Sequence, residues 1–331
     1  MTLYLHGLGH FHPENEITNR FLEELDIGTD EEWIVDRVGI RSRRTVLSLD
    51  YIRDTKNRDP SQAMEAALYT HADTGVFATE MALERAGITK DAIGMVIAGS
   101  SRPGLSAPAD ACYIAAALEM EVPALDINSA CTSMWVALYM LSNMRPESLP
   151  DYVLIVAPES LTTTVDYRER SASVLWGDCT AAAVVSTRIP SRIEMLDNTL
   201  QSSPAGHEKV VVPLFGHFGQ EGRTVQMFAI KKTVRCLRKI QESYPSPGRT
   251  LNFVGHQANL RMLESVCKQC GIEEDQHHRN VVEYGNAGAA GAPSVVSMNW
   301  DRWTDQDDVA VIGVGSGLTW ASYVLRFGDQ Q

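Results

Sequence analysis

The sequence predicts an α/β fold, and three observations support this prediction. Short apolar runs of strand length recur along the 331 residues, and longer stretches with helical spacing of apolar residues lie between them. Polar residues follow several of the predicted strands directly, at the carboxyl ends where α/β sheets collect their functional groups. The predicted strands cover residues 1–7, 95–98, 124–128, 152–157, 181–186, 253–255, 281–284, 309–314 and 321–327, and the predicted helices include residues 76–86, 111–118 and 258–270.

Cys131 lies near the most informative of these strand ends. It separates a short apolar run, residues 122–127, which we interpret as a buried strand, from a helix whose apolar face begins at Trp135. The unpaired N–H groups and the positive end of the helix dipole favour a thiolate at this place. A lone buried cysteine is also a common structural residue. This segment alone therefore leaves two interpretations open, a nucleophile or a core cysteine.

Two later segments favour the nucleophile. His256 follows the predicted strand 253–255, and Asn286 follows the predicted strand 281–284. Since the carboxyl ends of parallel strands meet at one edge of an α/β sheet, the three side chains can share one site. The sequence therefore predicts a catalytic set of Cys131, His256 and Asn286.

Several motifs in a fixed order make the chain resemble the β-ketoacyl-acyl-carrier-protein synthase III branch of the thiolase superfamily over nearly its whole length. The resemblance implies a thiolase fold, a five-layered αβαβα sandwich built from two duplicated halves. We expect the N-terminal half, with the nucleophilic cysteine, at residues 1–188. The C-terminal half, with the histidine and the asparagine, is expected at residues 189–331. The motifs are residues 30–41, 126–134, 177–183, 256–261, 285–286 and 315–320.

The same resemblance implies how the pocket around Cys131 is built. The backbone N–H groups of Cys131 and Ser316 are expected to form an oxyanion hole for a thioester carbonyl. Primer-loading members carry a phenylalanine at the position of Ala107, so the methyl group here should lengthen the acyl pocket. The residues expected at the pantetheine or coenzyme A entrance are Trp33, Arg37, Arg170 and Asn259. Those expected along the acyl chain are Ala107, Met134, Trp176 and Leu318.

The charge of the chain indicates which partners it can bind. The formal net charge of −13 makes nucleic acid a poor partner, since phosphates would be repelled. One predicted helix nevertheless carries a basic stripe, whose spacing puts its members on a single face. Such a stripe on an acidic protein can orient an acidic partner, and the resemblance implies docking of an acyl carrier protein with help from Arg261. An ordinary solvated helix face is the alternative interpretation. The basic stripe consists of Lys231, Lys232, Arg235, Arg238 and Lys239.

Other features of the sequence narrow the class of protein. No apolar run has membrane-spanning length, and residues 1–7 read as a strand rather than a signal peptide, so we expect a cytoplasmic protein without a membrane partner. The six cysteines have irregular spacing and suggest no disulfide framework. Cys267 and Cys270 have a CxxC spacing but no second ligand pair nearby, so no metal is expected.

These observations predict an acyltransferase of the ketosynthase type, standing alone in a specialised polyketide or fatty acid pathway. We expect a homodimer that needs no cofactor and takes acyl thioesters from acyl carrier protein or coenzyme A. It would join a medium or long acyl chain, or a β-ketoacyl chain, to a carrier-bound malonyl-type or β-ketoacyl partner by decarboxylative Claisen condensation. One alternative is an acyltransferase that forms an ester or amide without decarboxylation, and the other is a partner subunit of a heterodimeric synthase. Retention of both His256 and Asn286 disfavours the first alternative, and the intact nucleophile disfavours the second.

Overall fold

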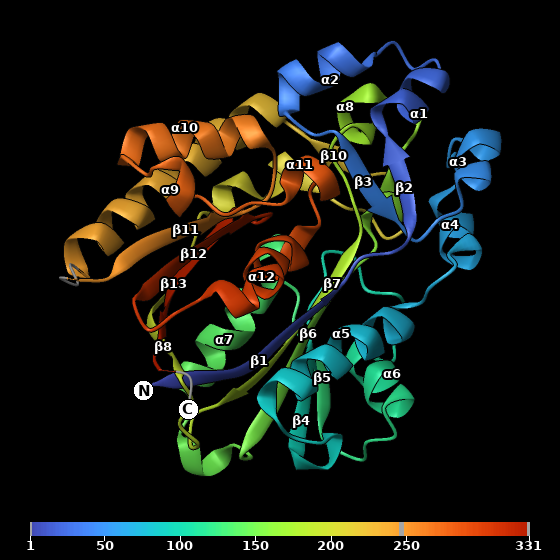
Figure 1. The fold of residues 1–331 in the computed structure, drawn as a ribbon. Helices are drawn as coiled ribbons and strands as arrows, with labels where there is room; N and C mark the ends of the chain where they lie inside the picture. Colours follow the sequence, from blue (N-terminus) through green and yellow to red (C-terminus); the bar gives the residue numbers. More distant parts are fainter. Residues whose placement is uncertain (1, 245–247, 330–331) are drawn as a thin grey trace.

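The computed structural model describes residues 2–244 and 248–329, and Figure 1 shows their arrangement. The centre is a nine-stranded sheet with the order β11-β12-β13-β8-β1-β7-β6-β4-β5. Its strands are β1 (Leu3–Phe11), β4 (Ile93–Ala98), β5 (Ala124–Asp126), β6 (Tyr152–Glu159), β7 (Cys179–Ser186), β8 (Ile193–Ser202), β11 (Thr250–Gly255), β12 (Asp307–Gly315) and β13 (Thr319–Phe327).

The sheet consists of two parts with the same strand pattern. In the first part β4 is parallel to β6, and the pairs β6–β7 and β7–β1 are antiparallel. In the second part β11 is parallel to β12, and the pairs β12–β13 and β13–β8 are antiparallel. Two residue pairs between β1 and β8 join the parts, which we call the first and the second half-sheet. The predicted boundary between residues 188 and 189 stays a prediction and falls in the connection between β7 and β8.

Helices lie on both sides of each half-sheet, which gives the five layers of the predicted thiolase sandwich (Figure 1). The helices α5 and α6 cover the first half-sheet, and α9 covers β12 and β13 with α10 beside it. Between the half-sheets lie α7 and α12, each of which contacts strands of both. The bounds are α5 (His71–Ala86), α6 (Asp110–Ala117), α7 (Ser133–Asn143), α9 (Gly222–Ser243), α10 (Leu260–Cys270) and α12 (Gly288–Met298).

The sequence of α12 suits its central position. Every residue from Gly288 to Ser297 is buried, and most of the side chains are as small as alanine or serine. A helix enclosed on all sides is apolar all round, and small side chains let two half-sheets approach it closely. The glycine- and alanine-rich run after Asn286 is therefore a packing element, as the sequence suggests.

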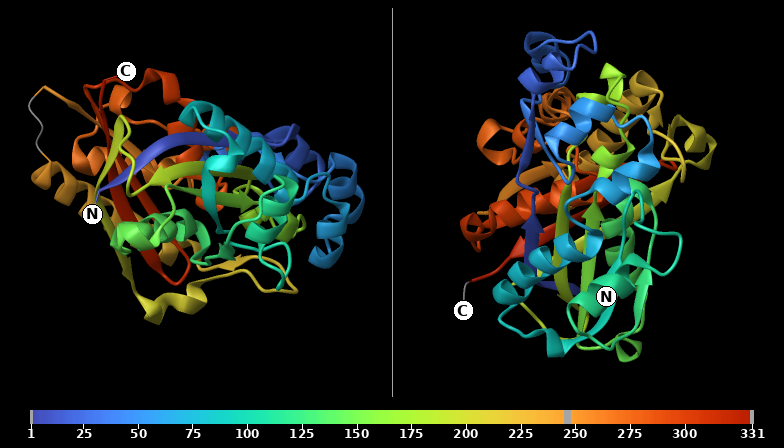
Figure 2. Two further views of the ribbon diagram at one scale, coloured as in Figure 1. Left: turned by 90° about the horizontal axis from the view of Figure 1, so that it is seen from below. Right: turned by 90° about the vertical axis from the view of Figure 1, so that its right-hand side faces the viewer.

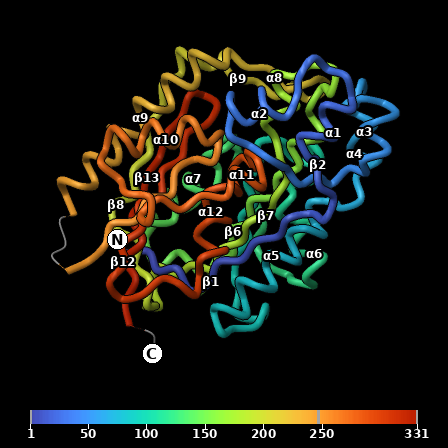
Figure 3. The backbone as a smooth tube through the Cα atoms, turned by 45° about the horizontal axis from the view of Figure 1, so that its top comes forward, coloured from blue at the N-terminus to red at the C-terminus, as the bar shows by residue number. Residues whose placement is uncertain are grey.

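Smaller elements complete the chain around one end of the sandwich. The segments α2, α8 and β9 lie together there (Figure 3), while α3 and α4 form one edge of the molecule (light blue in Figures 1 and 2). Among the described residues no helix has both the length and the apolar character needed to cross a bilayer. The bounds are β2 (Asn15–Thr18), α1 (Asn19–Glu24), α2 (Glu31–Val38), β3 (Ser42–Thr45), α3 (Leu49–Thr55), α4 (Pro60–Ala66), α8 (Arg170–Ser173), β9 (Val210–Val211), β10 (Gly219–Gln220) and α11 (Val281–Tyr284).

Two sequence predictions need correction. Residues 281–284, predicted as a strand, form the single helical turn α11, and the position beside β11 is taken instead by a parallel bridge between Phe253 and His277. A short apolar run fits a strand or a buried helical turn equally well, so periodicity alone could not decide. The strand before Cys131 is β5, which lies at the edge of the sheet with Leu125 exposed in the single chain, and is not buried.

Candidate active site

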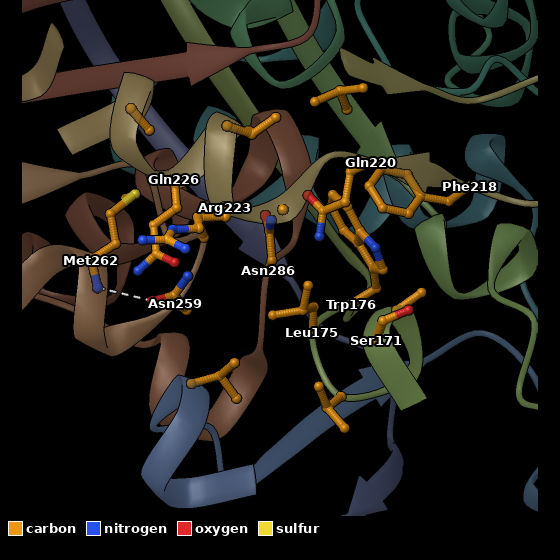
Figure 4. Close-up of a pocket in the computed structure, with 18 of the residues that line it drawn as sticks. Ser171, Leu175, Trp176, Phe218, Gln220, Arg223, Gln226, Asn259, Met262 and Asn286 are labelled. Carbon is orange, nitrogen blue, oxygen red and sulfur yellow. Dashed lines mark hydrogen bonds between the residues drawn. The ribbon is translucent and has the colours of Figure 1, made fainter. Parts of the chain in front are cut away.

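A pocket of about 1000 Å³ lies at the carboxyl ends of β11 and β12 (Figure 4). Its walls come from α2, α8, β9, the hairpin strand β10 and the beginnings of α9 and α10. Cys131, His256 and Asn286 all line it. The structure thus brings Cys131 together with two side chains that lie more than a hundred residues later in the sequence.

Cys131 lies on a single 3-10 turn, Ala130–Thr132, that leads into α7. Ala130 has a φ of 48°, a left-handed conformation that a side chain makes unfavourable. A Cβ atom on Gly315, at the end of β12, would lie 3.2 Å from the backbone nitrogen of Cys131. This close approach brings the backbone of Gly315 beside the Cys131 N–H, and the oxyanion hole of Cys131 and Ser316 stays a prediction.

The environment of Cys131 favours the thiol and not the thiolate. Burial, together with the negative charge of Glu159, raises the pKa of the Cys131 thiol to about 12. The sequence prediction of a thiolate favoured by the helix N-terminus is therefore corrected: loss of hydration outweighs the helix dipole in this enclosed place. The nucleophile must lose its proton when it reacts.

His256 follows β11 directly and is buried. Burial lowers the pKa of its imidazole to about 4, so the ring is neutral at neutral pH. Its Nδ1 atom has no hydrogen-bond partner among the described residues. The next residue, Gln257, accepts hydrogen bonds from the backbone N–H groups of Asn280 and Val281, at 3.0 and 3.1 Å. This side chain ties the turn that carries His256 to the start of α11.

Asn286 is fixed by its backbone and points its side chain into the pocket (Figure 4). Its N–H donates to the Leu175 carbonyl at 2.8 Å, and its carbonyl accepts from the Gly177 N–H at 3.1 Å. The side-chain Oδ1 accepts from the Gly288 N–H at 3.1 Å. Because the oxygen is engaged, the Nδ2 group is free to donate hydrogen bonds to a ligand.

All four residues predicted at the entrance line this pocket. The guanidinium of Arg170 lies 4.7 Å from the centre of the Trp33 ring, a cation–π contact between α8 and α2. Asn259 uses its Oδ1 to cap α10, accepting from the Met262 N–H at 2.8 Å. Arg37 lies in the last turn of α2. These groups give the pocket a cationic and aromatic rim.

Only one of the four residues predicted along the acyl chain lines the pocket. Trp176 does so, and its ring packs edge-on against Phe218 at 4.6 Å between centroids. Met134 lies on α7 and is buried in the central core, and Leu318 is buried against Gly206. Ala107 is exposed on the loop between β4 and α6. In the single chain these three side chains therefore lie away from the pocket that holds Cys131.

Sequence reasoning missed several residues at the site. The Ser101 hydroxyl lies near the Cys131 sulfur and donates to Glu159. The sequence carried a signal for Glu159, because this acidic residue ends an otherwise apolar strand. The segment around the start of α9 was also missed. Its pocket-lining residues include Phe218 and Gln220 before the helix and Arg223 and Gln226 in its first turns.

The basic stripe lies on α9, as predicted, along a second groove of about 990 Å³. Its members differ in exposure, because the Lys232 ammonium lies 3.7 Å from the centre of the Trp320 ring and is half-buried. Arg261 is not part of this groove: it donates to the carbonyls of Val35 and Asp36 at the end of α2. The structure does not place Arg261 with the stripe.

Comparisons with known proteins find similar sequences. Residues 125–204 match the family described as 3-oxoacyl-[acyl-carrier-protein (ACP)] synthase III, and residues 250–327 match the C-terminal part of the same synthase. The β-ketoacyl-[acyl-carrier-protein] synthase III of Oceanobacillus iheyensis is 29% identical over 332 residues, which cover 99% of this chain and 100% of that protein.

Solved structures with the same fold were also found. The 3-oxoacyl-[acyl-carrier-protein] synthase III of Aquifex aeolicus superposes with a TM-score of 0.85 at 26% identity, covering 98% of this chain and 100% of that one. The priming β-ketosynthase of the R1128 polyketide pathway superposes with a TM-score of 0.83 at 24% identity, over 99% and 97% of the two chains. The second likeness shows the fold alone.

Proposed function

We propose that the chain is a β-ketoacyl-[acyl-carrier-protein] synthase III-like condensing enzyme of the thiolase superfamily, and that it condenses a medium or long acyl chain with a carrier-bound partner. The observation that supports this most directly is that Cys131, His256 and Asn286 line one pocket. A thiol nucleophile and two hydrogen-bond donors are the groups that acyl loading and decarboxylative condensation require.

The first half-reaction loads the enzyme. Cys131 attacks the carbonyl carbon of an acyl thioester, the carrier thiol leaves, and the acyl group stays on the Cys131 sulfur. The negative oxygen of the tetrahedral intermediate would receive hydrogen bonds from the backbone N–H groups of Cys131 and Ser316. The left-handed turn at Ala130 and the approach of Gly315 to the Cys131 nitrogen support this arrangement, since both shape the backbone around the Cys131 N–H.

The second half-reaction forms the carbon–carbon bond. A malonyl-type thioester loses carbon dioxide and leaves an enolate, whose carbon attacks the acyl group and releases the Cys131 thiolate. The product is a β-ketoacyl thioester on the carrier. A neutral His256 and the Asn286 Nδ2 group can donate hydrogen bonds to the enolate oxygen, and such donors are typically worth about 3 to 4 kcal/mol each in an enclosed site.

The donor is expected at the cationic and aromatic rim of the pocket. Trp33, Arg37 and Arg170 suit a phosphate-bearing pantetheine or coenzyme A, because guanidinium groups bind phosphate in a bidentate way. We propose an acyl carrier protein as the macromolecular partner, with the basic stripe of α9 orienting its acidic surface. We also propose a homodimer in which the exposed loop around Ala107 reaches the pocket of the second copy.

The test uses intact-mass measurement of the purified protein. After exposure to octanoyl-coenzyme A or octanoyl-carrier protein, a single acyl adduct on Cys131 is expected, and addition of malonyl-carrier protein should discharge it with release of carbon dioxide. An adduct that passes to an alcohol or amine without decarboxylation would instead support the ester- or amide-forming alternative. A protein that never becomes acylated would support the role of a partner subunit.

A further inference from the structure

Behind Cys131 lies a hydrogen-bonded pair that the condensation does not use. The Ser101 Oγ lies 3.8 Å from the Cys131 Sγ, and it donates a hydrogen bond of 2.7 Å to Glu159 Oε1. Ser101 belongs to the loop after β4, and Glu159 is the last residue of β6. The two residues thus form a continuous path from the sulfur to a carboxyl group.

Glu159 is buried and surrounded by neutral donors. Its oxygens accept from the Ala289 N–H at 2.9 Å, the Ser101 N–H at 3.1 Å and the Ser100 hydroxyl at 3.3 Å. It forms no ion pair with a residue in the part of the chain that the structure describes. A Cβ atom on Gly288 would lie 2.5 Å from Oε1, so the glycine leaves room for the carboxyl group.

The pKa values of Cys131 and Glu159 suit the transfer of a proton from the thiol to the carboxyl group. Burial raises the pKa of the Glu159 carboxyl to about 7, although hydrogen bonds from Ala289 and Ser101 act in the opposite direction. The carboxyl can therefore both take and release a proton near neutral pH, which is the condition for an efficient general base. Burial also keeps the Cys131 thiol protonated, so its proton needs an acceptor.

We propose that Ser101 passes the thiol proton of Cys131 to Glu159 during acyl loading and returns it to the departing carrier thiol. The proposal rests on Cys131 being the nucleophile of the proposed function. Ser101 is the catalytic residue, because its hydroxyl touches the reacting sulfur. Glu159 is the positioning residue, which orients the Ser101 hydroxyl and holds the proton.

The step is balanced without a further reactant. Ser101 takes the thiol proton as its own hydroxyl proton moves to Glu159, and the new thiolate attacks the acyl carbon. The bond from that carbon to the carrier sulfur breaks, and the departing thiolate receives the proton back through Ser101. The acyl group moves from the carrier sulfur to Cys131, and one proton moves the other way.

Other charged groups near Glu159 shape its titration. His71, at the start of α5, is the cation that stabilises the ionised form of Glu159, and it is itself hydrogen-bonded to Asp110 at 2.9 Å and to Ser160 at 2.6 Å. The acids facing the carboxyl are Cys131 and Cys179, both neutral thiols because burial raises the pKa of each. The carboxyl of Glu159 is therefore the group expected to titrate near pH 7 along this path.

The experiment measures the rate of Cys131 acylation against pH by intact mass, for wild type, Ser101→Ala, Ser101→Thr and Glu159→Gln. Loading by wild type should rise through an inflection near pH 7. Ser101→Ala and Glu159→Gln should load about a hundredfold more slowly at pH 7 and lose that inflection, while Ser101→Thr keeps a hydroxyl and should retain most of the rate. Ser142→Ala, which removes the hydroxyl of a buried serine on α7 that donates to the Tyr139 carbonyl at 2.9 Å, is the matched control and should load like wild type.

Several results would overturn the relay. They are a Ser101→Ala rate equal to that of Ser142→Ala, a slower Glu159→Gln variant that keeps the wild-type inflection, and faster loading by Glu159→Gln. Faster loading would mean a purely electrostatic role, because removing the negative charge lowers the pKa of the thiol. If Glu159→Gln fails to fold, the Ser101 variants decide alone. A wild type without an adduct on Cys131 would refute the proposed function itself, which is a different outcome.

Discussion

The strands β6 and β12 occupy equivalent positions in the two half-sheets, but β6 ends in an acidic residue and β12 ends in a glycine. β6 ends in Glu159, whose carboxyl group reaches Ser101 and, through it, Cys131. β12 ends at Gly315, where the lack of a side chain lets the backbone approach the Cys131 nitrogen. The end of β6 thus supplies a proton acceptor, and the end of β12 supplies backbone close to the Cys131 nitrogen. Duplication gave one scaffold, and the chemistry differs only in the side chains at its edges.

The two central helices show the same division. α7 follows the nucleophile Cys131, and α12 follows Asn286, whose amide points into the same pocket. Under the proposed function, side chains of the first half of the chain serve acyl loading and side chains of the second half serve condensation, while backbone from both halves forms the oxyanion hole. If that division is correct, substitutions in the two halves should affect different half-reactions.

The largest effect is expected at the nucleophile. Cys131→Ala should abolish covalent acyl loading, because the other cysteines of the described chain lie away from the pocket. Intact-mass measurement with an acyl donor checks this, and Cys112→Ala, which changes an exposed cysteine, should load normally. An adduct that survives on the Cys131 variant would move the nucleophile elsewhere.

The second prediction separates the halves. Asn286→Ala should leave acylation of Cys131 largely intact and slow condensation by roughly a hundredfold or more, because the donor to the enolate oxygen is lost. Single-turnover loading and product formation from malonyl-carrier protein measure the two steps separately. If both steps fell equally, Asn286 would be needed to build the site, and the division between the halves would be wrong.

A third, smaller effect tests whether the first half also shapes the pocket of a second copy. Ala107→Phe should slow loading of octanoyl or longer donors roughly tenfold, since overpacking a tunnel typically costs about 1 to 3 kcal/mol. Acetyl loading should be nearly unchanged and serves as the internal control. Equal slowing of both donors, or a wild type that prefers acetyl, would refute the enlarged pocket.

The last prediction concerns stability and contrasts two buried carboxyl groups. Asp308 in β12 is held by Arg249 at 3.0 Å and by Arg326 at 2.8 Å, and the hydrogen bonds and charges of these guanidinium groups hold the pKa of its carboxyl below the ordinary value. Burial raises the pKa of Glu159, which forms no ion pair in the described chain, despite its hydrogen bonds and the charge of His71. Asp308→Asn should lower the free energy of unfolding at pH 7 by about 2 kcal/mol without changing acyl loading.

The pH dependence of this effect has a definite sign. A carboxyl whose pKa is lowered by folding stabilises the protein above its unfolded pKa, and the stabilisation is lost as the pH falls through the folded value. The difference between wild type and Asp308→Asn should therefore be present at pH 7 and shrink below about pH 4. Denaturant unfolding at both pH values measures it, and a difference that does not depend on pH would contradict the ionic explanation.

The sequence by itself determined the parts of the molecule that local patterns encode. The strand-to-helix junctions at Cys131 and His256 were predictable, because the spacing of apolar residues changes there from that of a strand to that of an amphipathic helix. The basic stripe of α9 followed in the same way from helical spacing. The prediction of Asn286 used a strand at residues 281–284 that is a helical turn in the structure, and the motifs added the fold and a second reason to include Asn286.

Tertiary structure decided whatever depends on residues far apart in the chain. The run at residues 281–284 became a helical turn because Gln257, from another segment, accepts the N–H groups at its start. Glu159 acquired its role only where β6 meets the loop of Ser101 and the start of α12. The protonation of Cys131 likewise depends on burial by all of these elements together. Periodicity reports which face of an element is apolar, but the pKa of a group depends on what packs against it.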